Sequence, residues 1–539
     1  MTAPHGRIPK PSNEPVLSYA PGSKERGSLE EAIGRMASEC PDIPVVVGSE
    51  EMRSGHKARV VMPHAHRHVL AQVHLAKPEH LDAAIRNAVA TQPSWAAMPF
   101  QERAAIFLRA ADLLAGPWRQ RINAACMLGQ SKTVYQSEID AIAEIADFFR
   151  YNAWYAEHIL DEQPEQAPLT WNRMDYRPLE GFVFALTPFN FLSIAANLPT
   201  APALLGNVVV WKPATTGALG AWHLLELLRE AGLPDGVINM VHGSGSEVAS
   251  AMLDSKHLAG IHFTGSTGTF RSLWKGVGER LERYRTFPRL VGETGGKDFI
   301  VAHPSADVTT LVTAILRGGF EYQGQKCSAP SRVYVPRSLW PKVRDWVVAG
   351  AATMGVGDVR DYRNFMGAVI DKKAFDSISG YLTVARATAK VLHGGTGDDR
   401  EGYFIQPTLV EVEDPKHRLM QEEIFGPVVT AWVYDDAKWT ETLDLVNDTS
   451  PYALTGAVFA RDRAAILEAH THLRNAAGNF YVNDKPTGAV VGQQPFGGAR
   501  QSGTNDKAGS MWNLVRWISP RAVKETFVAA TDYRYPFMG

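Results

Sequence analysis

Residues 181–186 (GFVFAL) and 207–211 (NVVVW) are the two short apolar runs that decide the fold class. The first is followed by Thr187-Pro188 and the second by Lys212-Pro213, so a proline closes each run. Short apolar runs that stop at such signals are typical of strands buried inside a sheet. We therefore expect two buried strands here.

Two more runs of this kind, residues 236–241 and 257–263, follow along the chain. Apolar residues at helical spacing occupy stretches between and after them, such as residues 219–231 and 270–284. Strands that alternate with helices predict a parallel sheet with right-handed crossovers, because parallel neighbours cannot be joined by a tight turn.

The second half of the chain repeats this organisation. Residues 299–302 and 333–335 are predicted strands, and residues 308–322 and 339–354 are predicted helices. A largely helical stretch, residues 79–158, precedes the strand predicted at residues 181–186. Because 539 residues are too many for one ordinary hydrophobic core, we expect two α/β domains.

Two polar, extended segments stand outside the alternation, residues 168–176 and 521–530. One interpretation is a pair of edge strands that bind a partner subunit. The other is a pair of solvated connectors, and the pattern favours neither.

The overall charge and the cysteines limit the function classes. The chain has 55 basic and 57 acidic residues, a formal net charge of -2, and no apolar run that could cross a bilayer, so we expect no nucleic-acid or membrane partner. Cys40, Cys126 and Cys327 are far apart and odd in number, which predicts a reducing compartment rather than a disulfide framework. Residues 1–18 have no apolar core and are interpreted as a frayed terminus, with a mitochondrial transit peptide left open.

Three polar clusters follow predicted strands, at residues 187–190, 212–215 and 264–267. Open α/β sheets bind ligands outside the carboxyl ends of their strands. The third cluster also precedes a predicted helix, whose free N–H groups suit a pyrophosphate, but an ordinary helix N-cap at Ser266 explains it equally well. Residues 243–248 begin like a dinucleotide fingerprint without its third glycine, so a loop is the better interpretation.

Two further segments contain groups that could do chemistry on a carbonyl. Glu293 follows a predicted strand and precedes paired glycines, which suits a general base, although an isolated loop glutamate is usually only solvated. Cys327 lies in a turn with polar neighbours (residues 321–330, EYQGQKCSAP), whereas most lone cysteines are inert core residues. With the amide of Asn190 as a donor, these groups could perform nucleophilic catalysis.

A metal site is not expected. His64, His66 and His68 alternate and would share one face of a strand, but the sequence offers no fourth ligand. A polar surface strand is therefore the better interpretation.

Six motifs together resemble the aldehyde dehydrogenase superfamily. They are Pro188-Phe189-Asn190, Lys212-Pro213, Phe263-Thr264-Gly265-Ser266, Glu293 with Gly295-Gly296-Lys297, Gly324-Gln325-Lys326-Cys327, and residues 422–427 (EEIFGP). Four features resemble the 1-pyrroline-5-carboxylate dehydrogenases within it: Phe189-Asn190-Phe191, residues 287–290 (FPRL), Cys327-Ser328 and residues 488–509. The likeness extends over residues 13–525.

The resemblance implies an α/β aldehyde dehydrogenase fold with a Rossmann-like cofactor domain, an α/β catalytic domain and a β-flap for oligomerisation. The cofactor domain would comprise residues 1–166 and 180–290, the catalytic domain residues 291–505, and the flap and tail residues 167–179 and 506–539. It also implies a homodimer or larger homo-oligomer, in the cytoplasm or, in a eukaryote, in the mitochondrial matrix.

The resemblance further implies NAD-dependent oxidation of glutamate γ-semialdehyde to glutamate through a thioester on Cys327. Asn190 would stabilise the oxyanion, and Glu293 would activate water. The implied cofactor contacts are Pro188, Lys212, Thr215, Thr264, Gly265, Ser266, Glu423 and Phe425, and the implied substrate contacts are Ser328, Gly488, Ala489, Phe191 and Phe496. Thr215 stands where many NAD-specific relatives have an acid, so some use of NADP is expected as well.

The sequence leaves three alternatives open. The nearest is another acidic semialdehyde as substrate, such as succinate semialdehyde. A non-catalytic relative is a different class, and the joint presence of Cys327, Glu293 and Asn190 argues against it. A thiol hydrolase would need a histidine partner, and no histidine lies close to Cys327 in the sequence.

Overall fold

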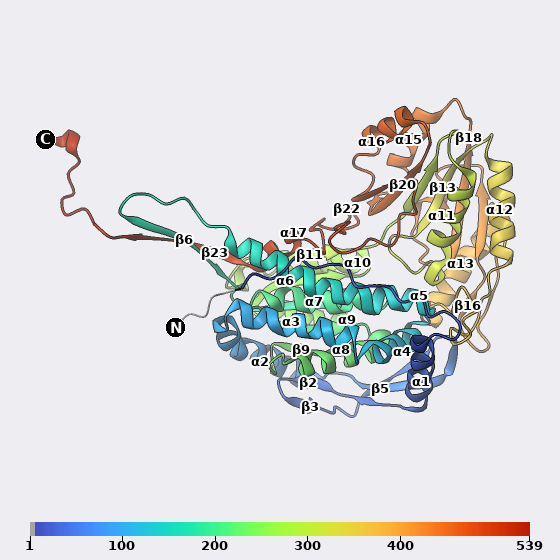
Figure 1. Cartoon of the computed structure of the whole chain (residues 1–539). Helices are drawn as coiled ribbons and strands as arrows, with labels where there is room; N and C mark the ends of the chain where they lie inside the picture. The colour runs from blue at the N-terminus through green and yellow to red at the C-terminus, as the bar shows by residue number, and fades with distance from the viewer. Residues whose placement is uncertain (1–5) are drawn as a thin grey trace.

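The structure is a computed structural model of the chain and describes residues 6–539. It contains two α/β bodies, one built on each large sheet, and a long two-stranded arm that projects from them (Figure 1). The two-body organisation agrees with the prediction from chain length.

The first large sheet has seven strands in the order β11-β10-β7-β8-β9-β2-β3. Its strands are β2 (Val45–Val47), β3 (Glu50–Met52), β7 (Phe182–Thr187), β8 (Val208–Pro213), β9 (Ile238–Met240), β10 (Leu258–Thr264) and β11 (Arg289–Glu293). The strands from β11 to β9 are parallel, as predicted, whereas β2 and β3 form an antiparallel edge. Every residue of β7 and β8 is buried, which explains their continuous apolar sequences.

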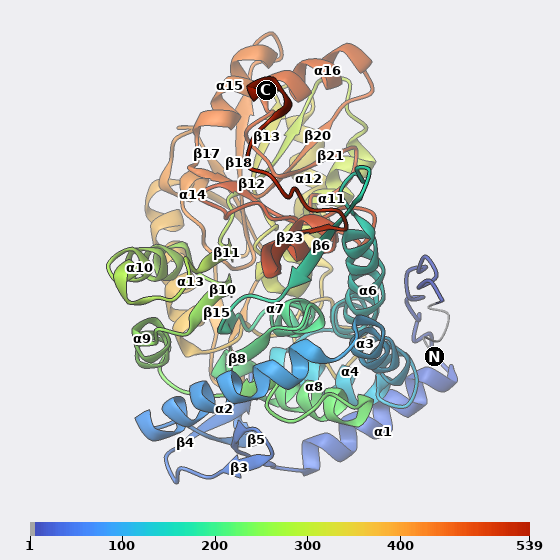
Figure 2. The same cartoon turned by 90° about the vertical axis from the view of Figure 1, so that its left-hand side faces the viewer.

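Helices surround this sheet, and α2 and α7 pack directly on its central strands (Figure 2). They are α1 (Lys24–Ser38), α2 (Pro78–Ala97), α3 (Phe100–Ala115), α4 (Arg119–Gln130), α5 (Val134–Ser137), the π-helical η1 (Glu138–Glu144), α6 (Ile145–Asp161), α7 (Leu192–Leu204), α8 (Ala218–Ala231), α9 (Gly245–Asp254) and α10 (Thr267–Gly278). The helical stretch predicted over residues 79–158 is confirmed as the run from α2 to α6.

The second large sheet has the order β14-β17-β18-β13-β12-β20-β21 and is parallel except for β14. Its strands are β12 (Asp298–Ala302), β13 (Pro330–Pro336), β14 (Lys390–His393), β17 (Thr408–Val412), β18 (Val428–Tyr434), β20 (Thr455–Phe459) and β21 (Asn479–Val482). Its helices are α11 (Val308–Phe320), α12 (Trp340–Ala352), α13 (Lys372–Thr388), α14 (Arg418–Gln421), α15 (Trp439–Asp448) and α16 (Arg463–His472). Phe299 and Val301 enter one hydrophobic core and Ile300 and Ala302 the other, so this sheet is covered on both faces.

Shorter elements complete the fold. They are β1 (Asp42–Ile43), β4 (Lys57–Met62), β5 (Ala65–His74), β15 (Gly397–Asp398), β16 (Phe404–Ile405), β19 (Tyr452–Ala453), β22 (Ala499–Arg500) and α17 (Met511–Leu514). The strand expected around the three histidines is β5, but His64 precedes it and is buried rather than exposed.

Two predicted helices have different bounds in the structure. The helix predicted over residues 270–284 begins earlier, because the Ser266 side chain caps α10 by accepting the N–H of Thr269 at 3.2 Å. The helix predicted over residues 308–322 ends at Phe320, because Tyr322 has a left-handed φ of 52° that a helix cannot contain.

The two extended segments outside the alternation are strands that pair with each other. Strands β6 (Thr170–Arg177) and β23 (Ser519–Thr526) form an antiparallel arm, with Arg177 opposite Ser519 and Thr170 opposite Thr526. The arm carries the C-terminal tail away from the body (Figure 1). Within residues 6–539 it makes a separate two-stranded sheet. The outer edge of β6 bonds to side-chain amides, with Gln166 on the backbone of Asn172 and Gln163 on that of Met174, so only the outer edge of β23 is left without such partners among these residues.

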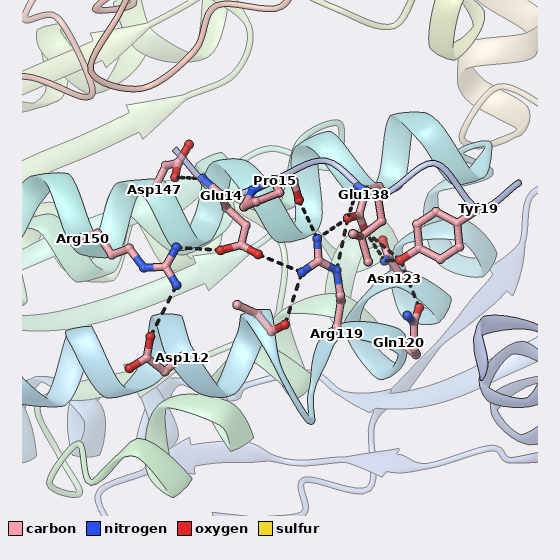
Figure 3. Close-up of polar contacts among 12 residues, drawn as sticks. Glu14, Pro15, Tyr19, Asp112, Arg119, Gln120, Asn123, Glu138, Asp147 and Arg150 are labelled. Carbon is pink, nitrogen blue, oxygen red and sulfur yellow. Dashed lines mark hydrogen bonds and ion pairs between the residues drawn. The ribbon is translucent and has the colours of Figure 1, made fainter. Parts of the chain in front are cut away.

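Residues 7–20, which we call the N-terminal strap, lie across the helices of the first body and are held there by buried charges (Figure 3). Glu14 binds Arg119 at 2.8 Å through Oε1 and Arg150 at 2.7 Å through Oε2. Arg119 also pairs with the buried Glu138, which accepts the hydroxyl of Tyr19 at 2.8 Å. The prediction of a frayed terminus is therefore wrong for residues 7–18, and residues 1–5 lie outside the described part.

We predict that Arg119→Met destabilises the fold by about 3–5 kcal/mol, because it leaves Glu14 and the buried Glu138 without their shared cation. Thermal unfolding should show a clear decrease in midpoint temperature. The matched control is Arg7→Met, whose ion pair with Asp161 is largely exposed and contributes less than about 1 kcal/mol. Equal midpoints for the two variants would contradict a stabilising role of the buried network.

Candidate active site

The polar clusters predicted from the sequence meet at one edge of the first sheet. Strands β7, β8, β10 and β11 are parallel neighbours, and Thr264 lies directly opposite Glu293 while Thr187 lies opposite Pro213. Strand β8 lies on one side of β7 and β10 on the other, so the strand order reverses at this edge. Open α/β sheets bind ligands at such a switch point.

A strained turn holds Cys327 opposite this edge. Tyr322, Gln323 and Gly324 have consecutive left-handed φ values of 52°, 57° and 67°. At Gly324 a Cβ would lie 2.2 Å from the carbonyl oxygen of Gly426, so this position admits only glycine. The side-chain amide of Gln323 is fixed by three backbone groups: the carbonyls of Ser131 at 3.1 Å and Ala368 at 2.7 Å, and the N–H of Gly367 at 2.9 Å.

Cys327 opens into a cavity to which both bodies contribute. Seven residues singled out from the sequence line it: Glu293, Cys327, Ser328, Phe191, Gly488, Ala489 and Phe496. Among the residues implied in cofactor contact, only Thr264 lines this cavity, and Asn190 does not line it. The structure therefore brings the candidate nucleophile, the candidate base and all the implied substrate contacts to one place.

The surroundings of Cys327 keep its thiol protonated. The side chain is partly accessible from the cavity, but burial raises its pKa well above the ordinary value of 9.0. The acidic side chains of Asp298, Glu423 and Glu293 raise it further. A thiol in this environment is a weak nucleophile until it loses its proton.

Glu293 is buried against the loop that follows β21. Its Oε2 accepts the N–H of Gly498 at 2.9 Å. Burial raises its pKa well above 4.5, while this N–H and the nearby ammonium of Lys507 act in the opposite direction. A carboxyl group with a raised pKa can accept and return a proton near neutral pH.

Asn190 and Phe191 are placed by a buried ion pair. Asp140, which lies in η1, accepts the N–H groups of Leu192 and Ser193, both at 3.0 Å, and so caps the start of α7. The carboxylate of Asp140 also forms an ion pair with the ammonium of Lys132. Asn190, just before α7, donates its amide to the carbonyl of Gln325 at 3.1 Å. The candidate oxyanion donor therefore lies beside the turn that carries Cys327.

The adjoining strand ends offer groups that fit a dinucleotide. Lys212 is buried, and its ammonium donates to the carbonyl of Pro213 at 3.3 Å. Burial lowers its pKa to about 8. Glu423 accepts the N–H of Gly296 at 3.0 Å, and burial raises its pKa to about 7. An ammonium and a carboxyl group with unused hydrogen-bonding capacity suit ribose hydroxyls.

The remaining implied cofactor residues lie at the same sheet edge or beside it. Gly265 and Ser266 precede α10, so the free N–H groups at the start of that helix face the strand ends, and the N-cap role of Ser266 is compatible with them. Pro188 follows β7, and Thr215 lies after β8. Phe425 has a left-handed φ of 57°. Its ring packs edge-on against that of Phe189, with 6.0 Å between the two ring centroids.

Three unpaired donors in the cavity suit an anion. Gly488 has a left-handed φ of 81°, which turns the chain so that Gly488 and Ala489 both line the cavity beside Ser328. Within residues 6–539, neither of their N–H groups nor the Ser328 hydroxyl donates a hydrogen bond. Backbone N–H groups in such a loop form an anion-binding nest.

Sequence reasoning missed several residues that line the cavity. Glu144 accepts the hydroxyl of Ser193 at 3.0 Å, and burial raises its pKa to about 8. Phe148 is buried in α6 but also lines the cavity, as do Lys507 and Asn513. An acid or an aromatic residue in a predicted helix carries no signal that it will face a ligand.

The weaker motifs have structural roles. Residues 243–244 form the expected loop, and Gly245 begins α9. His64 bonds to the hydroxyl of Ser131 at 3.0 Å. In the described part of the chain, no group of three or more His, Cys, Asp or Glu side chains could hold a metal ion. Nor does any helix there combine the length and apolar character needed to traverse a bilayer.

Comparison with known proteins gives a consistent result. The sequence profile of the Aldehyde dehydrogenase family matches residues 51–523. The chain is 50% identical over 536 residues to the "Delta-1-pyrroline-5-carboxylate dehydrogenase, mitochondrial" of Dictyostelium discoideum, covering 98% of this chain and 96% of that protein. The Homo sapiens protein of the same name is 49% identical over 532 residues, covering 98% and 94%. The crystal structure of the Delta-pyrroline-5-carboxylate dehydrogenase from Mycobacterium tuberculosis bound with NAD has a TM-score of 0.96 and 53% identity over the whole of both chains.

We predict that Cys327 in the free protein reacts slowly with iodoacetamide at neutral pH. Because burial raises the pKa of the thiol, its alkylation rate should still increase between about pH 8 and pH 10. The Cys40→Ala background removes the exposed thiol from the measurement. A rate that reaches its plateau near about pH 7 would show that Cys327 is already a thiolate at rest.

Proposed function

Because the chain belongs to the aldehyde dehydrogenase family, we propose that it oxidises glutamate γ-semialdehyde to glutamate with NAD. The semialdehyde forms when the ring of 1-pyrroline-5-carboxylate opens by hydrolysis. The observation that carries this substrate is the set of three unpaired donors, from Ser328, Gly488 and Ala489, in the same cavity as Cys327. They suit the carboxylate of an acidic aldehyde, and the names of the relatives support the same assignment.

Cys327 forms and releases the covalent intermediate. Its sulfur, once deprotonated, bonds to the aldehyde carbon, and the carbonyl oxygen becomes an oxyanion that accepts from the Asn190 amide and the Cys327 N–H. NAD, when bound, supplies the hydride acceptor that turns this adduct into a thioester. Glu293 then takes a proton from water, the hydroxide bonds to the thioester carbon, and the carbon–sulfur bond breaks to release glutamate.

Residues at the strand ends hold the cofactor in this proposal. Lys212 and Glu423 would bind its ribose hydroxyls, Ser266 would face its pyrophosphate, and Phe425 would pack against its nicotinamide side. Thr264, Gly265 and Pro188 complete the contacts. Thr215 places no negative charge near the adenosine ribose, so NADP is accepted to some degree.

The cavity measures the length of the substrate. The carboxylate donors, the Cys327 side chain and the rings of Phe191 and Phe496 all line this cavity, and in this proposal the two rings flank the aliphatic chain of the substrate. Succinate semialdehyde is shorter by one carbon and lacks the amino group, so it should bind less well in this cavity.

We propose the same domain division as the sequence suggested. The cofactor domain comprises residues 1–166 and 180–290, and the catalytic domain comprises residues 291–505. Residues 167–179 and 506–539 form an oligomerisation flap and tail, in which the outer edge of β23 can pair with a second copy of the chain in a homodimer or larger assembly. In a eukaryotic cell the compartment would be mitochondrial, as the names of the Dictyostelium and human relatives state.

We predict that Ser328→Ala lowers kcat/KM for glutamate semialdehyde by about tenfold, because a hydrogen bond to a carboxylate contributes about 1.5–3 kcal/mol. The rate with propionaldehyde, which has no carboxylate, should change by less than about twofold. NADH formation measures both, with Ser38→Ala in α1 as the control. Equal losses with both substrates would refute the carboxylate site, and a preference of the unmodified protein for succinate semialdehyde would identify the alternative substrate.

We predict that Glu293→Gln blocks turnover at thioester hydrolysis, because hydride transfer needs no base at this position. Rapid mixing should then show a burst of about one NADH per active site, followed by a slow steady state. Cys327→Ala is the control, since it removes the burst and the steady state together. Loss of the burst in Glu293→Gln would assign Glu293 to deprotonation of the thiol instead.

A further inference from the structure

The loop of residues 488–494, which we call the anchor loop, carries the carboxylate donors but lies in no helix or strand. One part of it is fixed by packing, because Val491 is buried against Phe148 and Tyr151 of α6. At Gly492 a Cβ would lie 2.3 Å from the ring of Tyr151, so the loop approaches this helix closely. Packing alone does not set the direction of its N–H groups, which needs directional bonds as well.

One side chain of the N-terminal strap supplies such bonds. Asn13 donates from Nδ2 to the carbonyl of Val491 at 2.8 Å and to the carboxylate of Asp147 at 2.7 Å. Its Oδ1 accepts the side-chain amide of Gln493 at 2.8 Å. Two acceptors face Nδ2 and a donor faces Oδ1, so the orientation of this amide is determined. Its three hydrogen bonds join the anchor loop to α6.

The strap itself cannot shift, because it is bound independently of the anchor loop. Asp147 accepts the N–H of Glu14 at 2.8 Å, and Glu14 is held by Arg119 and Arg150 (Figure 3). These contacts fix Asn13 relative to α6, whatever the state of the loop.

The strap also borders the path to the active site. Asn13 and Glu14 line a second cavity, which shares Phe191, Gly488 and Ala489 with the cavity that contains Cys327. The strap therefore forms an outer wall beside the carboxylate donors.

We propose that Asn13 is a positioning residue, through which the N-terminal strap holds the anchor loop in the conformation that recognises the substrate carboxylate. This inference rests on the proposed function, because it concerns selectivity between aldehydes with and without a carboxylate. Asn13 does not touch the reacting atoms and has no part in the thioester chemistry.

The first test is Asn13→Ala in the full-length protein. We expect kcat/KM for glutamate semialdehyde to fall about tenfold, equivalent to about 1.4 kcal/mol, through an increase in KM with kcat nearly unchanged. With propionaldehyde kcat/KM should change by less than about twofold. Hydrogen exchange at the anchor loop should become faster. The matched control is Lys10→Ala, a strap residue whose ammonium lies 5.9 Å from the ring centroid of Trp154.

Gln493→Ala provides a second test, which stands alone if Asn13→Ala does not fold. Gln493 is exposed, and its side chain reaches the strap only through Asn13. It should lower kcat/KM for glutamate semialdehyde in the same direction but less, and it should add nothing in the Asn13→Ala background.

The outcomes separate this inference from the proposed function. If the unmodified protein prefers glutamate semialdehyde to propionaldehyde and the variants keep that preference, the positioning role is wrong and the function stands. The positioning role is also wrong if the variants lose activity equally with both aldehydes. If the unmodified protein shows no such preference, both the function and this inference are refuted.

Discussion

The left-handed turn at Tyr322, Gln323 and Gly324 is the constraint on which the active site depends. Each non-glycine residue in this conformation costs on the order of 1 kcal/mol, so the turn persists only because its surroundings hold it. The amide of Gln323 is bound by Ser131 from the first body and by residues 367–368 from the second. The same contacts that offset the strain therefore join the two bodies and aim Cys327 at the strand ends of the first sheet.

Burial between the two bodies also changes the pKa values of the site residues. Burial shifts the pKa values of Cys327, Glu293 and Glu423 upward and that of Lys212 downward, in each case toward the uncharged form. Burial thus makes the uncharged form of each of these groups easier to reach than it is in water. In the proposed reaction, negative charge develops on the substrate oxygen, and the amide of Asn190, which bonds to the turn that carries Cys327, is the proposed donor to it.

The parts of the structure that the sequence predicted are those whose signal is local. Strands β7 and β8 are buried on both faces, so their sequences are apolar throughout. Glu293 ends a strand and precedes paired glycines, and Cys327 lies in a turn with polar neighbours. The missed parts depend on residues far apart in the chain. The strap contact between Glu14 and Arg119 spans 105 positions, and a frayed terminus looks the same in sequence as a bound one. Glu144 was missed because its place in the cavity depends on how η1 packs against α7, which its residue type does not reveal.

The protonated state of Cys327 also affects how readily the protein is oxidised when no substrate is bound. Peroxides attack thiolates far faster than thiols, and the sulfenic acid that results can be oxidised further to irreversible products. A nucleophile that was ionised at rest would be lost steadily in any cell that generates hydrogen peroxide. The burial that makes Cys327 a weak nucleophile before substrate binds thus also protects its thiol from oxidation by peroxides.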